Sequence, residues 1–120
     1  MQRRQFRRVK TGLRVEYSLE EKPSREAQLV AYTKDVGAKG MCFSVKEDIP
    51  LNTILSLNIY LADNAGPIAA KARVVWKGKF TGIDKSVRYD IGVDITEIDE
   101  GGQKRLRQHL FDLVDTKKKK

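Results

Sequence analysis

The fold is decided by two neighbouring stretches, IAAKARVVWK at residues 68–77 and VRYDIGVDI at residues 87–95. In each stretch, every second residue is mostly apolar, and many of the residues between them are charged or glycine. A period of two is typical of a strand that buries one face and exposes the other. Residues 78–85 separate the stretches and contain the glycine and aspartate residues typical of turns. We therefore expect two half-buried strands joined by a turn, with Trp76 in the core or at its rim.

Four further segments read as strands for the same reasons, and turn residues separate them. Six short strands with one polar face each predict a mainly β fold, an antiparallel barrel whose closure removes exposed sheet edges. The predicted strands are residues 13–19, 29–32, 41–45, 55–61, 68–77 and 87–95.

The hydrophobic period changes near the C-terminus, where leucines recur at helical spacing. We expect a helix over residues 99–115 that flanks or plugs the barrel, with Asp99 as its N-cap. The chain then divides into a flexible basic N-terminal arm (1–12), a barrel domain with its helix (13–115) and a disordered lysine tail (116–120). The residues on the predicted apolar helix stripe are Leu106, Leu110, Leu113 and Val114.

The positive charge is concentrated at the two ends of the chain. The formal net charge is +8, yet residues 1–14 hold six basic residues and no acid, and residues 117–120 are four lysines. The remaining body is close to neutral, whereas nucleic-acid-binding domains usually spread basic residues over a folded face. The focused N-terminal cluster favours a small anionic ligand over a long polyanion.

Several classes of function find no support in the sequence. A single cysteine, Cys42, and a single histidine, His109, exclude a disulfide framework and metal sites built on several thiolates or imidazoles. No nucleophile–base arrangement is evident, so we expect neither an enzyme nor a cofactor. No apolar run of membrane-spanning length and no signal-peptide pattern is present, so we expect a soluble, cytoplasmic protein without a membrane span.

Two short motifs carry the chemistry that remains. The first is the basic cluster Arg4-Gln5-Phe6-Arg7-Arg8, preceded by Arg3, and the second is the turn Asp35-Val36-Gly37-Ala38-Lys39-Gly40. A guanidinium binds phosphates and guanine edges through two parallel hydrogen bonds. A carboxylate beside glycines presents an acceptor and bare backbone to the same ligand. The two motifs together predict an anion clamp.

The spacing of these motifs resembles the PilZ domain family, whose signature is R-x-x-x-R followed by D/N-x-S-x-x-G. The resemblance implies a six-stranded barrel and a binding site for the bacterial second messenger cyclic di-GMP (c-di-GMP). It implies that Arg4 and Arg8 contact guanine and phosphate and that Asp35 and Gly40 belong to the second half of the site. By the same resemblance, Arg3 immediately before the first motif favours an intercalated ligand dimer.

The chain departs from the family pattern at Gly37, where the family has serine. One neutral hydrogen bond contributes about 0.5–1.5 kcal/mol, so the missing hydroxyl weakens binding without abolishing it. The leading hypothesis is a c-di-GMP receptor that signals to an unidentified protein effector. A divergent scaffold that binds proteins and not the nucleotide stays open because of Gly37. A small-barrel nucleic-acid binder stays open but is disfavoured by the neutral body and by the lack of an evident exposed aromatic platform.

Overall fold

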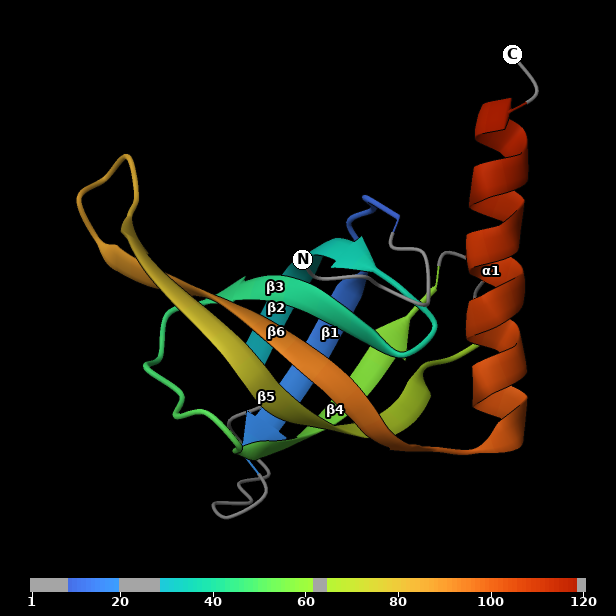
Figure 1. The fold of residues 1–120 in the computed structure, drawn as a ribbon, viewed down its shortest axis with the longest axis horizontal. Helices are drawn as coiled ribbons and strands as arrows, with labels where there is room; N and C mark the ends of the chain where they lie inside the picture. The colour runs from blue at the N-terminus through green and yellow to red at the C-terminus, as the bar shows by residue number, and fades with distance from the viewer. Residues whose placement is uncertain (1–8, 20–28, 62–64, 119–120) are drawn as a thin grey trace, which may run out of the picture.

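The computed structural model describes residues 9–19, 29–61 and 65–118. Figure 1 shows a strand-built body with one helix beside it. The elements are β1 (Arg14–Leu19), β2 (Leu29–Val36), β3 (Gly40–Val45), β4 (Ile54–Tyr60), β5 (Ile68–Thr81), β6 (Val87–Ile98) and α1 (Glu100–Lys118).

The six strands of the described chain close into a barrel in the order β1-β2-β3-β6-β5-β4. Every neighbouring pair is antiparallel, and β1 closes the barrel by pairing with both β2 and β4. The predicted mainly β fold, a six-stranded antiparallel barrel with a C-terminal helix, is therefore confirmed.

The inward faces of all six strands form one hydrophobic core. Each strand contributes at least one side chain with no exposed surface, and α1 adds Leu106. Close packing of these side chains fills the interior of the barrel. The fully buried set includes Val15, Val36, Phe43, Leu55, Val74, Ile91 and Leu106.

Three strands are longer than predicted by at least three residues, and β2 is the one that matters for the site. The prediction ended this strand at residue 32 and placed Asp35 in a turn, whereas β2 continues through Asp35 to Val36. A register shift between Thr33 and Asp35 marks a bulge opposite β3. The extra residue breaks the period of two, so the alternation that reveals the other strands is lost here. The other two, β5 and β6, extend to Thr81 and Ile98.

A second bulge moves Trp76 out of the core. The alternating pattern placed Trp76 on the same face as Val74, but the register shifts between Val74 and Trp76. Val74 is fully buried while Trp76 is 53% exposed. One extra residue sends the following side chains to the opposite face of a strand. The expectation of a core or rim tryptophan was therefore wrong, and the indole lies on the outer face of β5.

Helix α1 begins where the sequence predicted and ends later. The Gly102 amide donates to the Asp99 carboxylate at 2.5 Å, which confirms Asp99 as the N-cap. The helix ends at Lys118 and not near Asp115, so part of the segment assigned to the lysine tail is helical.

Two adjacent glycines in the first turn of α1 are expected to respond oppositely to alanine. A Cβ at Gly102 would lie 2.7 Å from Ile68 Cγ2, whereas the nearest atom to a Cβ at Gly101 is 3.7 Å away. We expect Gly102→Ala to lower the free energy of unfolding by about 1–2 kcal/mol through overpacking. We expect Gly101→Ala to raise it by up to about 1 kcal/mol. Urea denaturation of both variants measures this, and equal shifts would show that close packing does not explain Gly102.

Candidate functional site

The turn between β2 and β3 is closed by its own backbone and attached to β6. The Gly37 amide donates to the Gly40 carbonyl at 2.7 Å. The Lys39 carbonyl accepts from the Ile95 amide of β6 at 2.8 Å. Gly37 and Gly40 are buried and Asp35 is half-buried. These contacts make the turn a rigid part of the barrel wall.

The chain following the arginine motif is bonded directly to this turn. Val9 and Val36 form an antiparallel bridge in which each amide donates to the other carbonyl at 2.8 Å. Val36 lies between Asp35 and Gly37, and Val9 directly follows Arg8. The bridge therefore joins the residue that follows the first motif to a residue of the second motif.

A buried threonine fastens the next residues to the same strand. The Thr33 hydroxyl accepts from the Leu13 amide at 2.8 Å and donates to the Thr11 carbonyl. The Thr33 amide also donates to the Leu13 carbonyl at 2.9 Å. Thr33 is 6% exposed, so its hydroxyl satisfies backbone groups that water reaches poorly. The segment entering β1 is therefore held to β2 at two places, by Val36 and by Thr33.

The bulge in β2 aligns Asp35 with the outer face of the sheet. Asp35 pairs with Cys42 of β3, whose neighbours Met41 and Phe43 are fully buried. Because neighbours on a strand point to opposite faces, Cys42 belongs to the outer face. The same cross-strand row continues through Gly92 of β6. Small side chains thus follow Asp35 across the outer surface.

The row ends at Trp76, which pairs with Gly92. A Cβ at Gly92 would lie 3.5 Å from Trp76 Cβ, and a Cβ at Gly78 would lie 3.2 Å from the indole Cη2. The indole therefore rests on two glycines and keeps 53% of its surface exposed. Neighbouring strands are about 4.8 Å apart, so three steps separate Asp35 from Trp76 by about 14 Å along the sheet.

The sequence reading missed this exposed aromatic because the bulge breaks the alternation. The glycines at positions 78 and 92 are the signal that could have indicated it, since a strand glycine often marks a place where another group lies close to the backbone. Tyr32 on β2 is also exposed, at 61%. Exposed aromatic side chains therefore do lie on the strands, contrary to the predicted lack of an aromatic platform.

An ion pair lies beside this row. Lys34 Nζ is 2.8 Å from Asp90 Oδ2, and the Ser44 hydroxyl donates to Asp90 Oδ1 at 2.6 Å. The Lys34 ammonium also lies 5.2 Å from the centre of the Phe80 ring. Asp90 thereby links β2, β3 and β6 on the outer face and offsets the charge of Lys34.

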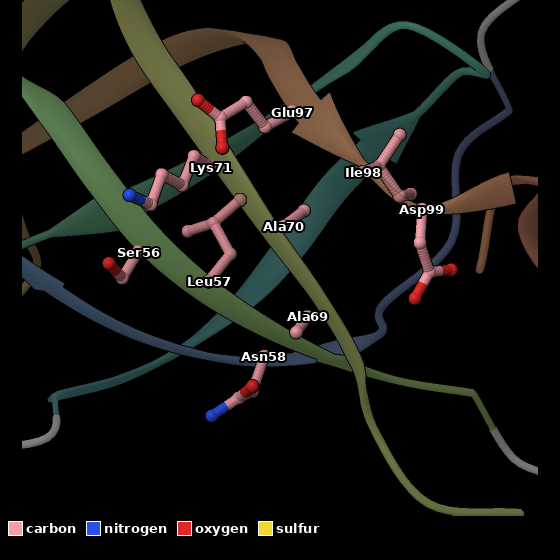
Figure 2. A pocket seen from close by; sticks show the side chains of 9 residues that line it. All are labelled: Ser56, Leu57, Asn58, Ala69, Ala70, Lys71, Glu97, Ile98 and Asp99. Atoms are coloured by element: carbon pink, nitrogen blue, oxygen red, sulfur yellow. The ribbon is translucent and has the colours of Figure 1, made fainter.

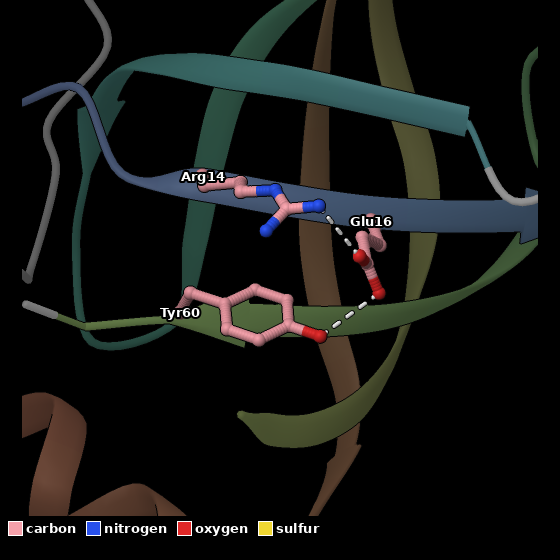
Figure 3. A network of polar contacts seen from close by, with 3 residues as sticks. All are labelled: Arg14, Glu16 and Tyr60. Carbon is pink, nitrogen blue, oxygen red and sulfur yellow. Dashed lines mark hydrogen bonds and ion pairs between the residues drawn. The ribbon is translucent and has the colours of Figure 1, made fainter. Parts of the chain in front are cut away.

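Arg14, the arginine of β1, contacts residues outside the candidate site. Arg14 Nη2 lies 2.9 Å from Glu16 Oε2, and its guanidinium carbon lies 5.0 Å from the centre of the Tyr60 ring. The Tyr60 hydroxyl donates to the other Glu16 oxygen at 3.0 Å, as Figure 3 shows. This hydrogen bond raises the pKa of Tyr60. Arg14 is directed toward β4, away from the turn, so we do not include it in the candidate site.

A depression of about 480 Å³ lies elsewhere on the barrel, over β4 and β5. Polar side chains around it include Asn58, Lys71 and Glu97, with Asp99 at the helix end (Figure 2). None of residues 35–40, the motif that the structure describes, lines it. It is therefore separate from the described part of the candidate site.

The structure brings together some of the predicted ligand residues. Asp35, Gly37 and Gly40 lie at one end of β2 and β3, next to Val9. Arg3, Arg4 and Arg8 lie outside the described residues, so their grouping with Asp35 stays a prediction. No group of three or more His, Cys, Asp or Glu that could hold a metal occurs among the described residues. Within the same residues, no helix is long and apolar enough to cross a bilayer.

The comparisons with known proteins agree with this architecture. The PilZ domain model matches residues 2–112. The chain is similar to the Bacillus subtilis inhibitor of motility MotI/DgrA, with a TM-score of 0.69 and 21% identity over 96% of this chain and 53% of that one. It is similar to K. pneumonia MrkH in its apo state, with a TM-score of 0.74 and 19% identity over 100% of this chain and 56% of that one.

A third similar structure is the PilZ domain of Escherichia coli YcgR with c-di-GMP, with a TM-score of 0.69 and 12% identity over 96% of this chain and 94% of that one. The chain spans about half the length of MotI/DgrA and MrkH. No curated protein sequence matches it. Identities this low establish the fold alone, whereas the family match covers almost the whole chain. The protein belongs to the PilZ domain family.

Proposed function

We propose that this protein is a c-di-GMP receptor in which the arm, residues 1–12, and the β2–β3 turn hold the nucleotide from two sides. The observation that carries the proposal is the Val9–Val36 bridge, which attaches the arm to the turn within one residue of Asp35. The similar PilZ domain of YcgR and the similar protein MrkH have both been solved with c-di-GMP. Family membership and the bridge support the same ligand.

The arginines of the arm match the anionic and purine parts of this ligand. In the proposal, Arg4 and Arg8 donate to guanine O6 and N7 and to phosphate oxygens, as guanidinium groups do elsewhere. Arg3 adds a third guanidinium, whose flat face stacks on a purine. A third cation favours two intercalated ligand molecules per chain over one, because the dimer carries twice the negative charge.

The barrel side of the site would complete guanine recognition. Asp35 accepts from the guanine N1–H and N2–H groups, and the backbone at Gly37 and Gly40 allows close approach. Trp76, at the end of the same cross-strand row, offers an exposed aromatic face for base stacking. Each charge-assisted hydrogen bond contributes about 1.5–3 kcal/mol, and micromolar affinity corresponds to about 8 kcal/mol. A few of these contacts are therefore sufficient.

Ligand binding would then act as a signal and not as a chemical step. A nucleotide held between the arm and the barrel changes the surface that a protein effector meets. The proposal therefore assigns a receptor and adaptor role to a cytoplasmic protein, with no catalysis and no cofactor besides the bound nucleotide. The divergent scaffold, in which Gly37 marks loss of the ligand, differs from it in one measurable property, the affinity for c-di-GMP.

Calorimetric titration with c-di-GMP tests the proposal directly. We expect saturable binding, with two ligands per chain if the intercalated dimer forms and one if it does not. GTP and a short DNA duplex serve as controls, because a basic arm with exposed Tyr32 and Trp76 could also attract these polyanions. Absence of saturable c-di-GMP binding would favour the scaffold, and equal affinity for duplex DNA would favour the nucleic-acid binder.

We expect Gly37→Ser to tighten c-di-GMP binding by up to about tenfold, because one added hydrogen bond is worth about 0.5–1.5 kcal/mol. The matched control is Gly37→Ala, which adds a side chain without a donor. Calorimetry of both variants separates the hydroxyl from the added bulk. If Gly37→Ser leaves the affinity unchanged, or lowers it as Gly37→Ala does, the glycine does not weaken binding by removing a ligand hydrogen bond.

A further inference from the structure

The β5–β6 hairpin extends past the barrel as a two-stranded ribbon. Pairing between β3 and β6 ends at Val45 and Tyr89, and pairing between β4 and β5 reaches no further than Arg73. Residues 79–88, here called the hairpin tip, begin at the Lys79–Tyr89 pair. Beyond that pair, the described pairing is within the hairpin, between Phe80 and Arg88 and between Thr81 and Val87. Figure 1 shows this ribbon projecting from the side of the barrel opposite α1. Isolated two-stranded ribbons are marginally stable in water, so the tip needs its own support.

That support comes from a turn with internal hydrogen bonds. The Gly82 amide donates to the Ser86 carbonyl at 2.8 Å, and the Lys85 amide donates to the Gly82 carbonyl at 2.9 Å. Asp84 Oδ1 accepts from the Ser86 amide at 3.0 Å and from its hydroxyl at 2.6 Å. These bonds lower the pKa of Asp84. The turn is ordered, and these backbone donors can leave water without losing a partner.

The ordered turn presents apolar side chains to the outside. Ile83 at its apex is 105% exposed, Val87 is 44% exposed and Phe80 is 36% exposed. Phe80 pairs with Arg88 and Thr81 pairs with Val87 in the next register position, so Phe80 and Val87 point to opposite faces of the ribbon. A flat protein surface that packs against one face of the ribbon would cover either Phe80 or Val87. A lipid layer into which the tip inserts would cover Phe80, Val87 and Ile83.

The charges on the tip indicate which medium this is. Lys79, Lys85 and Arg88 are the cations of residues 79–88, and Asp84 is the acid. The Asp84 carboxylate accepts hydrogen bonds from Ser86 and keeps its charge, so the net charge of the tip is +2. Apolar residues flanked by cations are typical of segments that bind anionic membrane surfaces. We propose that the hairpin tip docks on a bilayer containing anionic lipids, with Ile83 among the acyl chains at the headgroup boundary and the three cations on lipid phosphates.

Co-sedimentation of the full chain with vesicles tests this without any nucleotide. We expect binding to phosphatidylglycerol–phosphatidylcholine vesicles, weaker binding as salt is raised, and little binding to phosphatidylcholine alone. Ile83→Asp should lower the partition constant at least about tenfold, since burial of such a side chain is worth one to two tenfold steps. The matched control is Phe111→Asp, which should bind as the parent does. Phe111 is 65% exposed and belongs to α1, and α1 lies on the opposite side of the barrel from the ribbon (Figure 1).

A second measurement tests insertion of the tip with a variant that keeps an apolar residue at position 83. In a Trp76→Phe background, which removes the single tryptophan, Ile83→Trp should show a blue shift in emission with anionic vesicles and none with neutral ones. Equal loss in the two aspartate variants, or no vesicle binding, would overturn the proposal. If vesicle binding is absent and Ile83→Asp instead abolishes self-association in analytical ultracentrifugation, a second copy of the chain is the occupant of the tip.

Discussion

Arg8→Ala is expected to weaken c-di-GMP binding by roughly 100-fold while the barrel stays folded. A bidentate guanidinium makes two charge-assisted hydrogen bonds, and losing them costs about 3 kcal/mol or more, which is roughly two tenfold steps. Arg8 is the residue directly before Val9, whose bridge partner Val36 follows Asp35 on β2. We expect Arg4→Ala to have an effect of similar size. Calorimetry measures both.

The matched control for these variants is Arg14→Ala. It removes the same side chain a few residues further along, where the guanidinium already contacts Glu16 and the Tyr60 ring. Its c-di-GMP affinity should stay within about twofold of the parent, because it lies outside the proposed site. If Arg4→Ala and Arg8→Ala bind as tightly as Arg14→Ala, the arm is not part of the site, although the protein could still bind the ligand elsewhere.

Thr33→Val is expected to lower the free energy of unfolding by about 2–4 kcal/mol. Valine has the shape of threonine but leaves the buried Leu13 amide and the Thr11 carbonyl without their partner. Each buried unsatisfied group costs about 1–3 kcal/mol. Because the same bonds fasten residues 11–13 to β2, we also expect faster amide exchange in this segment and weaker c-di-GMP binding. Urea denaturation and hydrogen exchange measure the two effects.

Thr33→Ser is the control for this substitution. Serine keeps the hydroxyl and removes one methyl group, so it should cost only about 1 kcal/mol. Equal losses in the valine and serine variants would mean that packing of the methyl group, and not the hydroxyl, holds the segment. If Thr33→Val lowers stability but leaves c-di-GMP affinity normal, then attachment of residues 11–13 to β2 is not needed for ligand binding by the arm.

The prediction from sequence was most accurate where one face of a strand is buried without interruption. Segments 13–19 and 55–61 were placed within one residue of β1 and β4, because burial of alternate residues leaves a period of two in the sequence. The N-cap at Asp99 was likewise predictable, because a cap is a local interaction between residues three apart.

The two errors that affect the candidate site share one cause, a bulge. At Thr33–Asp35 and at Val74–Trp76 an extra residue changes which face the following side chains occupy. The alternation of a single strand does not reveal these positions, because a bulge is defined by the pairing with the partner strand. The exposed indole of Trp76 and the strand position of Asp35 both follow from these bulges, and both bear on the candidate site.

Residue order alone was sufficient for the number and type of the elements, for the two motifs and for the family they resemble, since hydrophobic period, capping and motif spacing are local properties of the chain. The meeting of the arm with the turn is a long-range property. It depends on two hydrogen bonds between Val9 and Val36, which are 27 positions apart, and on a threonine that fastens residues of another segment. Contacts of this kind form because barrel closure brings distant strands side by side. They are therefore visible in the folded structure and not in the sequence.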